Sequence, residues 1–525
     1  MFKLNNSEKG LPGIIAASSL GTLIEWYDFY IFGSLAIIIA TKFFPSENPT
    51  LALLSTLATF AAGFVVRPFG ALFFGRLGDL IGRKYTFLLT LVIMGLSTFL
   101  IGCIPGYDTI GYLAPILVLV LRLLQGLALG GEYGGAATYV AEHSPAEHRG
   151  FWTSWIQTTA TVGLFVSLLV IIGVKGWLSD AAFNDWGWRV PFWISIVMVG
   201  ISILIRMRMK ESPLFQKAKD DGKTATNPLK ESFGNRLNFK FVLLALFGAT
   251  MGQGVVWNTG QFYALSFIQT TLSIDVSQAS KLIMVALLFG TPFFVVFGWL
   301  SDKIGRKWIM LIGMLIALVS YRPIYAAMYD AGSITNKTEI TTSTVTDIKS
   351  AADATMPGDS IRTTILLKTY EDGTSYKEIK KLAIHTDIAK ANIAKDTKIT
   401  KAVTLDTGSF WKLVFLVFIQ VIFVTMVYGP IAAFLVEMFP MRIRYTSMSL
   451  PYHIGNGIFG GLLPAVATYL ATKATLANEV AAKAGTKLPY DKPFLEGLWY
   501  PIIIAAVCFV IGVLYINGKD NRIED

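Results

Sequence analysis

Long apolar runs alternate with short polar segments along the chain. A helix that crosses a bilayer needs about 20 mostly apolar residues, and twelve runs reach roughly that length. They lie near residues 13–40, 52–75, 84–104, 111–141, 152–173, 189–207, 240–272, 278–299, 308–328, 411–437, 447–470 and 498–516. The pattern predicts an all-α membrane protein with twelve transmembrane helices.

Two longer polar segments divide these runs. Residues 208–239 are rich in lysine, and residues 329–409 are rich in threonine, lysine and aspartate. We therefore expect an N-terminal six-helix bundle (1–207), a central loop (208–239) and a C-terminal six-helix bundle (240–525) interrupted by the insert 329–409. The insert is expected to be a small folded cap or a disordered segment. Within the insert, apolar and polar residues alternate along Ile361–Tyr370 as they do in a strand, and Tyr376–Lys401 is expected to be partly helical.

Basic residues are concentrated in alternate loops, after the second, fourth, sixth, eighth and tenth runs. The residues concerned are Arg76, Arg83, Lys84, His148, Arg149, Arg206, Arg208, Lys210, Lys217, Lys219, Lys303, Arg306, Lys307, Arg442 and Arg444. Cytoplasmic loops carry an excess of lysine and arginine. This distribution predicts that both termini lie in the cytoplasm and the insert outside. We expect the membrane to be a bacterial-type inner (plasma) membrane.

The composition supports a membrane protein. Only 15% of the residues are charged and 53% are hydrophobic, whereas soluble proteins carry about 25% charged residues. The net charge of +10 comes mainly from loops and the insert, so we expect no nucleic-acid partner. Cys103 and Cys508 both lie inside apolar runs and offer neither a disulfide framework nor metal-ligand spacing.

A ten-residue motif occurs once in each half. Gly75–Lys84 and Gly298–Lys307 both read G-x-x-x-D-x-x-G-R-K, and each follows the second run of its half. A glutamate precedes an arginine by seven residues in both halves, as Glu142–Arg149 and Glu437–Arg444. A carboxylate is stabilised at the N-terminus of a helix, so we expect the motif aspartates to bind neighbouring helix ends and the arginines to pair with the acids. The predicted cytoplasmic gate comprises Gly75, Asp79, Gly82, Arg83, Glu142, Arg149, Asp302, Gly305, Arg306, Glu437 and Arg444.

The repeated motif resembles the signature of the major facilitator superfamily. Further motifs are similar to those of its metabolite:H⁺ symporter family, whose known members move α-ketoglutarate, citrate, shikimate, or proline and betaine. They are Glu25-Trp-Tyr-Asp28-Phe-Tyr, Arg67-Pro-Phe-Gly, Arg122-Leu-Leu-Gln-Gly, Gly130-Gly-Glu132-Tyr-Gly-Gly and Trp186-Gly-Trp-Arg189-Val-Pro-Phe. The resemblance covers essentially the whole chain except 329–409, and it implies a coupling or substrate role for Arg122.

Ionisable residues inside the membrane are costly and usually face a cavity or a partner. Glu25 and Asp28 lie three residues apart on one helix face, and two close carboxylates compete for a proton. We interpret them, with Glu132, as candidate proton-coupling residues. The alternative is structural: an ion pair with an arginine for Glu25 and Asp28, or a neighbouring loop held by Glu132.

Two intramembrane arginines are candidates for binding an anion. Arg122, with Gln125 three residues on, and Arg67 remain charged at neutral pH. They could hold a substrate carboxylate or neutralise Glu25 or Asp28, and the alternative is pairing between helices. Arg189, at the start of the sixth run, is read as an interface anchor.

Uncharged polar groups beside aromatic rings suit recognition of an organic ligand. The remaining candidate substrate-binding residues are Tyr30, Trp257, Asn258, Gln261, Tyr428 and Asn456. Each could instead serve only in helix packing, and His453 is read as a hydrogen-bonded core residue.

The preferred hypothesis is a proton-coupled importer of a small organic acid, such as a di- or tricarboxylate or a shikimate-like carboxylate. The main alternative is a symporter of zwitterionic osmolytes, with Trp26, Tyr30 and Trp257 as an aromatic cage. A transporter-like nutrient sensor is a further alternative, and an exporter stays possible because gradients set the direction. We find no nucleophile–base pair, metal cluster or phosphate loop, so no enzyme and no cofactor are expected. The expected partners are the solute, protons and the lipid bilayer, and the chain is expected to work as a monomer.

Overall fold

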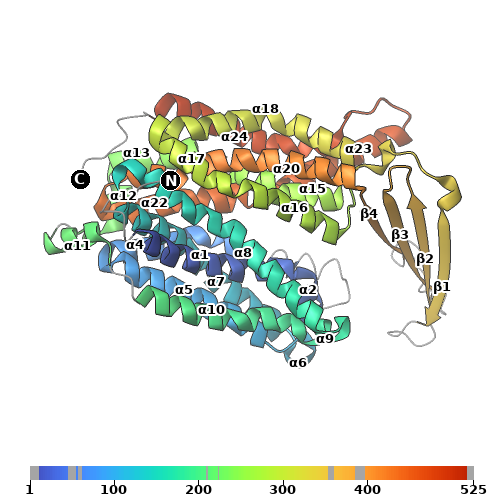
Figure 1. Cartoon of the computed structure of the whole chain (residues 1–525), viewed down its shortest axis with the longest axis horizontal. Helices are drawn as coiled ribbons and strands as arrows, with labels where there is room; N and C mark the ends of the chain where they lie inside the picture. The colour runs from blue at the N-terminus through green and yellow to red at the C-terminus, as the bar shows by residue number, and fades with distance from the viewer. Residues whose placement is uncertain are drawn as a thin grey trace.

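The computed structural model describes residues 11–44, 55–56, 59, 62–207, 211–222, 224–352, 360–384 and 397–516. Two groups of roughly parallel helices lie against each other, and a β-sheet projects beyond one end of them (Figure 1). The first half of the expected second span, and Arg208 and Lys210, lie mostly or wholly outside the described residues.

The first bundle, α1 to α10, comes from the N-terminal half. Its helices are α1 (Leu11–Ser34), α2 (Ala36–Phe43), α4 (Arg67–Ile81), α5 (Arg83–Cys103), α6 (Tyr107–Ile110), α7 (Leu113–His143), α8 (Arg149–Trp177), α9 (Asp180–Asp185) and α10 (Val190–Met207). Two short helices, α11 (Pro213–Asp220) and α12 (Pro228–Gly234), connect it to the next bundle.

The second bundle, α13 to α24, contains π-helical turns inside two of its longest helical segments. One segment runs α13 (Arg236–Ala245), η4 (Leu246–Thr250), α14 (Met251–Asn258), η5 (Thr259–Tyr263) and α15 (Ala264–Thr270). Another runs α22 (Arg444–His453), η10 (Ile454–Gly460) and α23 (Leu463–Lys483). The others are α16 (Val276–Gly290), α17 (Pro292–Ile304), α18 (Arg306–Gly332), α20 (Thr407–Tyr428), α21 (Ile431–Met438), η11 (Pro493–Leu498) and α24 (Trp499–Tyr515). Such π turns occur often at functional sites.

Ten helical segments in the described residues are long and apolar enough to cross a membrane. Together with α1 and the helix that contains α4, they account for the twelve predicted spans. The repeated motif is not a simple loop, because its first half forms the last turns of α4 and α17. Gly82 and Gly305 then end these helices with φ of 123° and 96°, a backbone conformation that strongly favours glycine.

The two bundles pack tightly at the end that carries the repeated motif, which we call the repeat side. There α4 contacts α22, and α8 contacts α17. A Cβ atom on Gly150 would lie 2.5 Å from the carbonyl oxygen of Gly298, so only glycine permits this approach of the two helices. Lys307 donates to the Val513 carbonyl at 3.0 Å, which places the end of α24 on the repeat side.

The opposite end, which we call the sheet side, carries a four-stranded antiparallel sheet in the order β1-β2-β3-β4. Its strands are β1 (Val345–Ala352), β2 (Ser360–Thr369), β3 (Ser375–Ile384) and β4 (Thr397–Thr404). The expected strand at 361–370 matches β2. The partly helical expectation for 376–401 is wrong, because 376–384 pairs with β2 across a turn at Gly373 (φ 89°) and 397–401 pairs with β3. Residues 385–396 lie outside the described part.

The sheet is fastened to the second bundle at two points. Val403 of β4 exchanges backbone hydrogen bonds with Ser273 and Asp275, each at 2.8 Å, in the turn between α15 and α16. Lys337 binds the carboxylates of Asp372 and Asp406 and the Ser409 hydroxyl. The sheet is therefore tied to helices of the second bundle.

Candidate substrate-binding and coupling site

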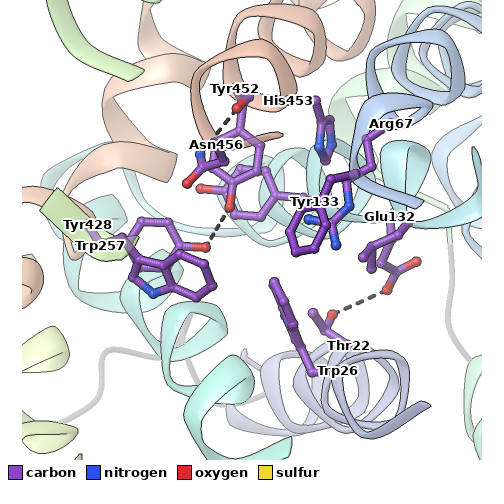
Figure 2. A pocket seen from close by; sticks show the side chains of 12 residues that line it. Thr22, Trp26, Arg67, Glu132, Tyr133, Trp257, Tyr428, Tyr452, His453 and Asn456 are labelled. Carbon is purple, nitrogen blue, oxygen red and sulfur yellow. Dashed lines mark hydrogen bonds between the residues drawn. The ribbon is translucent and has the colours of Figure 1, made fainter. Parts of the chain in front are cut away.

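A small cavity lies between the bundles, and we call it the central cavity (Figure 2). Side chains from α1, α7 and the helix containing α4 face others from α14, α20, α22 and η10. The lining residues are Thr22, Trp26, Phe64, Arg67, Leu129, Glu132, Tyr133, Trp257, Tyr428, Tyr452, His453 and Asn456. The free space is about 20 Å³, which is room for a water molecule rather than an organic solute.

Arg67 is the permanent cation among the described residues that line this cavity. Its guanidinium carbon lies 4.6 Å from the Phe29 ring and 4.1 Å from the Phe64 ring. The side chain is buried, and its Nε and Nη2 have no hydrogen-bond partner among the described residues. Buried donors without partners are costly, and the carboxylate of an anionic ligand beside Arg67 could satisfy them.

Three tyrosines and a histidine also line this cavity. Tyr133 and Tyr452 stack across the bundle interface at 3.5 Å, and the Tyr428 and Tyr452 hydroxyls lie 2.5 Å apart. Neither ring nitrogen of His453 has a hydrogen-bond partner among the described residues. The ring is buried and borders the cavity.

Aromatic pairs that span the bundles close the central cavity toward the sheet side. Trp26 of α1 contacts Trp257 at 6.0 Å, and Tyr30, one turn further along, stacks on Phe262 at 6.2 Å. Trp26 and Tyr30 also stack on each other at 5.6 Å. We call these four residues the aromatic gate.

A buried cluster of two carboxylates and one guanidinium lies beside the central cavity. Arg206 donates to Glu132 at 2.7 Å and lies 3.7 Å from Glu25. Glu132 also accepts from Thr22 at 3.2 Å and Thr90 at 3.0 Å. With both acids ionised, these three groups would carry a net negative charge in a site with almost no solvent exposure, so binding one proton would neutralise them.

Arg206 was not among the predicted site residues. In the sequence it stands at the end of the sixth span, where it reads as one of the loop cations. The structure turns it inward, onto the Phe87 ring at 3.4 Å and the Phe87 carbonyl at 2.7 Å. Gly21 makes this possible, because a Cβ there would meet the guanidinium at 1.9 Å.

A separate polar network lies inside the first bundle. Ser195 donates to Asp28 at 2.6 Å. Arg122 donates to Gln125 at 2.7 Å, and Gln125 donates to Thr98 at 2.7 Å. Arg122 does not border the central cavity, because Phe29 separates it from Arg67, with 4.9 Å from the Arg122 guanidinium to the ring.

The predicted residues of the second half divide into two groups. Trp257, Tyr428 and Asn456 border the cavity, whereas Asn258 and Gln261 do not. Asn258 donates to the Gly254 carbonyl of its own helix at 3.0 Å. Asn456 exchanges hydrogen bonds of 3.1 and 2.7 Å with Gln253, a residue that sequence reasoning missed.

The repeated motif forms crossed contacts on the repeat side. Asp79, in the first bundle, accepts from the Thr446 amide at 2.9 Å near the start of α22. Asp302, in the second bundle, accepts from the Gly150 and Phe151 amides at 2.7 and 2.8 Å at the start of α8. Each aspartate therefore binds the N-terminal end of a helix in the other bundle, where the helix dipole favours an anion.

The charged residues that the two halves share extend these contacts. Arg83 lies 3.1 Å from Asp79 and 3.5 Å from Glu142, while Arg306 lies 2.6 Å from Asp302 and 2.9 Å from Glu437. Between the bundles, Arg444 pairs with Glu142 at 3.3 Å and Arg149 with Glu437 at 3.4 Å. These pairs link the two bundles on the repeat side.

Two residues of the central loop, which were not predicted from the sequence, join this network. Ser212 binds the Glu142 carboxylate, and Glu211 accepts from the Arg83 amide at 3.2 Å at the start of α5. The central loop thereby ties the end of the first bundle to the charged contacts.

The chain is similar to known membrane transport proteins. The family model described as "Sugar (and other) transporter" matches residues 14–238. The proline/betaine transporter of Escherichia coli K12 is 36% identical over 318 residues, which are 59% of this chain and 63% of that one. The chain thus spans somewhat under two thirds of that relative's length.

Two further relatives extend the match. The α-ketoglutarate permease of Escherichia coli K12 is 36% identical over 333 residues, 63% of this chain and 75% of that one. A putative metabolite transport protein of Haemophilus influenzae is 28% identical over 520 residues, 99% of this chain and 96% of that one.

The solved structure of the proton:xylose symporter XylE, bound to 6-bromo-6-deoxy-D-glucose, shares the fold with a TM-score of 0.67 at 15% identity. The match covers 98% of each chain. The match to 75% of the α-ketoglutarate permease at 36% identity shows the family: the chain belongs to the major facilitator superfamily, and its relatives there are metabolite and proline/betaine transporters.

Proposed function

We propose that this transporter imports a small organic solute with one carboxylate, in symport with a proton. The observation that carries the proposal is Arg67, whose unpaired donors face the central cavity. A guanidinium binds a carboxylate with two parallel hydrogen bonds. Because Arg122 lies behind Phe29, a single cation meets the solute, which favours a monocarboxylate over a di- or tricarboxylate.

The rest of the solute would lie against aromatic rings. Trp26, Trp257, Tyr428 and Tyr452 line the cavity, and Glu132 adds a negative charge. Such walls suit a flat or apolar acid, and they also suit a cationic head through cation–π contact. A zwitterion such as proline or betaine is therefore the second candidate, and the proline/betaine transporter is one of the relatives.

Proton coupling would use the cluster of Glu25, Glu132 and Arg206. Glu132 touches both Arg206 and the central cavity, so its charge is felt by a bound solute. A proton on one carboxylate neutralises the cluster and removes a negative charge beside the incoming solute carboxylate. Asp28, one turn from Glu25, and Tyr445, whose hydroxyl donates to the Gly131 carbonyl, are the other titratable groups facing the cluster. In this scheme Arg206, and not Arg122, is the cation that pairs with the carboxylate of Glu25.

The transport cycle would alternate two closures. The charged contacts of the repeat side and the aromatic gate are both closed in this structure, so it resembles an occluded state. Opening the aromatic gate would admit proton and solute from the sheet side, and breaking the charged pairs would release them on the repeat side. We place the repeat side and both termini in the cytoplasm on the strength of the basic loops.

The test is proton entry into proteoliposomes that contain a pH-sensitive dye. Shikimate, 2-oxoglutarate, proline and glycine betaine would be added separately. We expect internal acidification with a monocarboxylate or a zwitterion, lost in Arg67→Ala and weakened in Arg67→Lys, which keeps the charge without the planar fork. Acidification with 2-oxoglutarate alone would overturn the one-carboxylate assignment. Acidification that survives Arg67→Ala would overturn the role of Arg67.

A further inference from the structure

We propose that a second cavity, on the sheet side of the aromatic gate, is a separate binding site that receives the solute before it enters the central cavity. The inference rests on the proposed function for the identity of the solute. This sheet-side cavity has a volume of about 300 Å³, which is within the range of small-molecule sites. The central cavity, in contrast, is too small for a solute in this state.

The sheet-side cavity lies between α15, the middle of α23 and η11. It is lined by Tyr263, Ser266, Phe267, Thr270, Thr271, Thr468, Ala471, Thr472, Thr475 and Phe494. Thr468, Thr472 and Thr475 follow the spacing of one face of α23. Six hydroxyl-bearing serine and threonine side chains from two facing helices therefore surround the space.

Several of these hydroxyls are available to a ligand. Thr270 and Thr475 donate to carbonyls of their own helices, at 2.6 and 3.0 Å, and keep oxygen lone pairs free. Within the described residues, Ser266, Thr468 and Thr472 form no hydrogen bond through their side chains. A carboxylate can accept from the free hydroxyls of Ser266, Thr468 and Thr472, and an ammonium group can donate to the oxygens of all five.

One end of the sheet-side cavity is a rigid aromatic surface. Phe494 stacks on Tyr329 at 4.2 Å and contacts Phe267 at 6.0 Å. Tyr263 is held against Tyr325 at 5.5 Å. These rings provide an apolar surface for the carbon skeleton of a solute.

The position along the helix links the two cavities. Tyr263 directly follows Phe262 of the aromatic gate, and Trp257 of the central cavity lies six residues earlier, about 9 Å along a helix. The π-helical turn η5, Thr259–Tyr263, lies between them. A solute in the sheet-side cavity is therefore about one molecular length from the central cavity, with the gate between.

The described lining residues carry no charged side chain, so binding must be weaker and less selective than at Arg67. Neutral hydrogen bonds each contribute modestly. We expect millimolar affinity for both monocarboxylates and zwitterions. Replacing the two hydroxyls in a Thr468→Val/Thr472→Val variant should raise KM about tenfold while kcat is kept.

The direct test is protection of an engineered cysteine. Cys103 and Cys508 are replaced by serine, Thr472→Cys is introduced, and its reaction with a water-soluble methanethiosulfonate is followed with and without shikimate, proline or glycine betaine. Lys473→Cys, the next residue on the same exposed turn, is the matched control. The experiment is repeated in the Arg67→Ala variant, which removes the proposed binding of solute in the central cavity.

We expect millimolar solute to slow modification of Thr472→Cys at least threefold, equally with and without Arg67, and to leave Lys473→Cys unaffected. Protection that disappears with Arg67→Ala would overturn the second site, since it would then arise from the central cavity alone. Equal protection of Lys473→Cys, or no protection by any of the three solutes, would overturn it as well. The proposed function fails separately, if Arg67→Ala retains solute-driven proton uptake.

Discussion

Arg206 of α10 donates a 2.7 Å hydrogen bond to Glu132 of α7 in a region with almost no solvent exposure. The same guanidinium lies 3.7 Å from Glu25 of α1. One arginine thereby joins three helices of the first bundle and leaves one carboxylate without an equal positive charge. Since Glu132 also borders the central cavity, this pair connects the proposed proton site to the proposed solute site.

Removing Arg206 alone should destabilise the protein. An Arg206→Met variant leaves two buried carboxylates without a cation, and breaking a buried ion pair costs about 3–5 kcal/mol. The thermal unfolding midpoint in detergent should fall clearly. Adding Glu132→Gln should recover most of the loss without restoring coupled transport. An additive loss in the double variant would contradict the pairing.

The two motif aspartates should have equivalent effects on the closed repeat side. Asp302→Asn weakens acceptance from the Gly150 and Phe151 amides, and Asp79→Asn weakens acceptance from Thr446. Each change should cost about 1–2 kcal/mol of closure and shift the population toward a state open on the repeat side. Cysteine accessibility on that side would measure the shift. Unchanged accessibility in both variants would show that these hydrogen bonds do not hold the closure.

A methyl group at the closest bundle contact should prevent full closure. A Cβ on Gly150 would lie 2.5 Å from the Gly298 carbonyl, whereas Gly173, on the same helix α8, has no heavy atom within 4 Å of that position. Gly150→Ala should slow transport severalfold and increase accessibility on the repeat side. Gly173→Ala should leave both unchanged. Equal behaviour of the two variants would mean that the contact of α8 with α17 does not limit the cycle.

Acidic pH should weaken the attachment of the sheet to the second bundle. Burial would raise the pKa of Asp406, but hydrogen bonds from Ser409 and Lys337 outweigh it and hold that pKa below its usual range. An Asp whose pKa is lower in the folded protein than in the unfolded chain stabilises the fold. This stabilisation is fully present above the pKa of the unfolded chain, about 3.9, and it is lost as the pH falls through the pKa of the folded protein. Hydrogen exchange in β3 and β4 should therefore accelerate below about pH 4. Asp406→Asn should show faster exchange at neutral pH and a flatter pH response. Unchanged exchange in the variant would remove Asp406 from the attachment.

Much of the fold could be predicted because its signals are local. Apolar runs of membrane length give the spans, and the doubled motif gives the two-bundle architecture. The contacts of Asp79 and Asp302 followed from the same motif, because a carboxylate beside a helix N-terminus has a physical use. The strand at 361–370 could be predicted because apolar and polar residues alternate along it. Strand β3 could not, because its lysines and alanine favour a helix, and only the hydrogen bonds from β2 make it a strand.

The composition of the site was only partly predictable. Arg67, Glu132, Trp257, Tyr428 and Asn456 meet at the central cavity as candidates of the right chemical type. The direction of a long side chain cannot be read from a single helix, and Arg122 and Arg206 illustrate this. Arg122 points to Gln125 and the rings of α1, while Arg206 folds inward over Gly21 and Phe87.

The central claim is that Glu132 carries the negative charge that couples the proton to the solute. The most direct test measures proton entry and labelled-solute entry in the same proteoliposomes, for the wild-type chain and for Glu132→Gln, with Thr90→Val as the control that removes one hydrogen bond but keeps the carboxylate. We predict a fixed ratio of the two fluxes in the wild type and in Thr90→Val. In Glu132→Gln we predict solute exchange without proton entry. Proton entry at the wild-type ratio in Glu132→Gln would contradict the account.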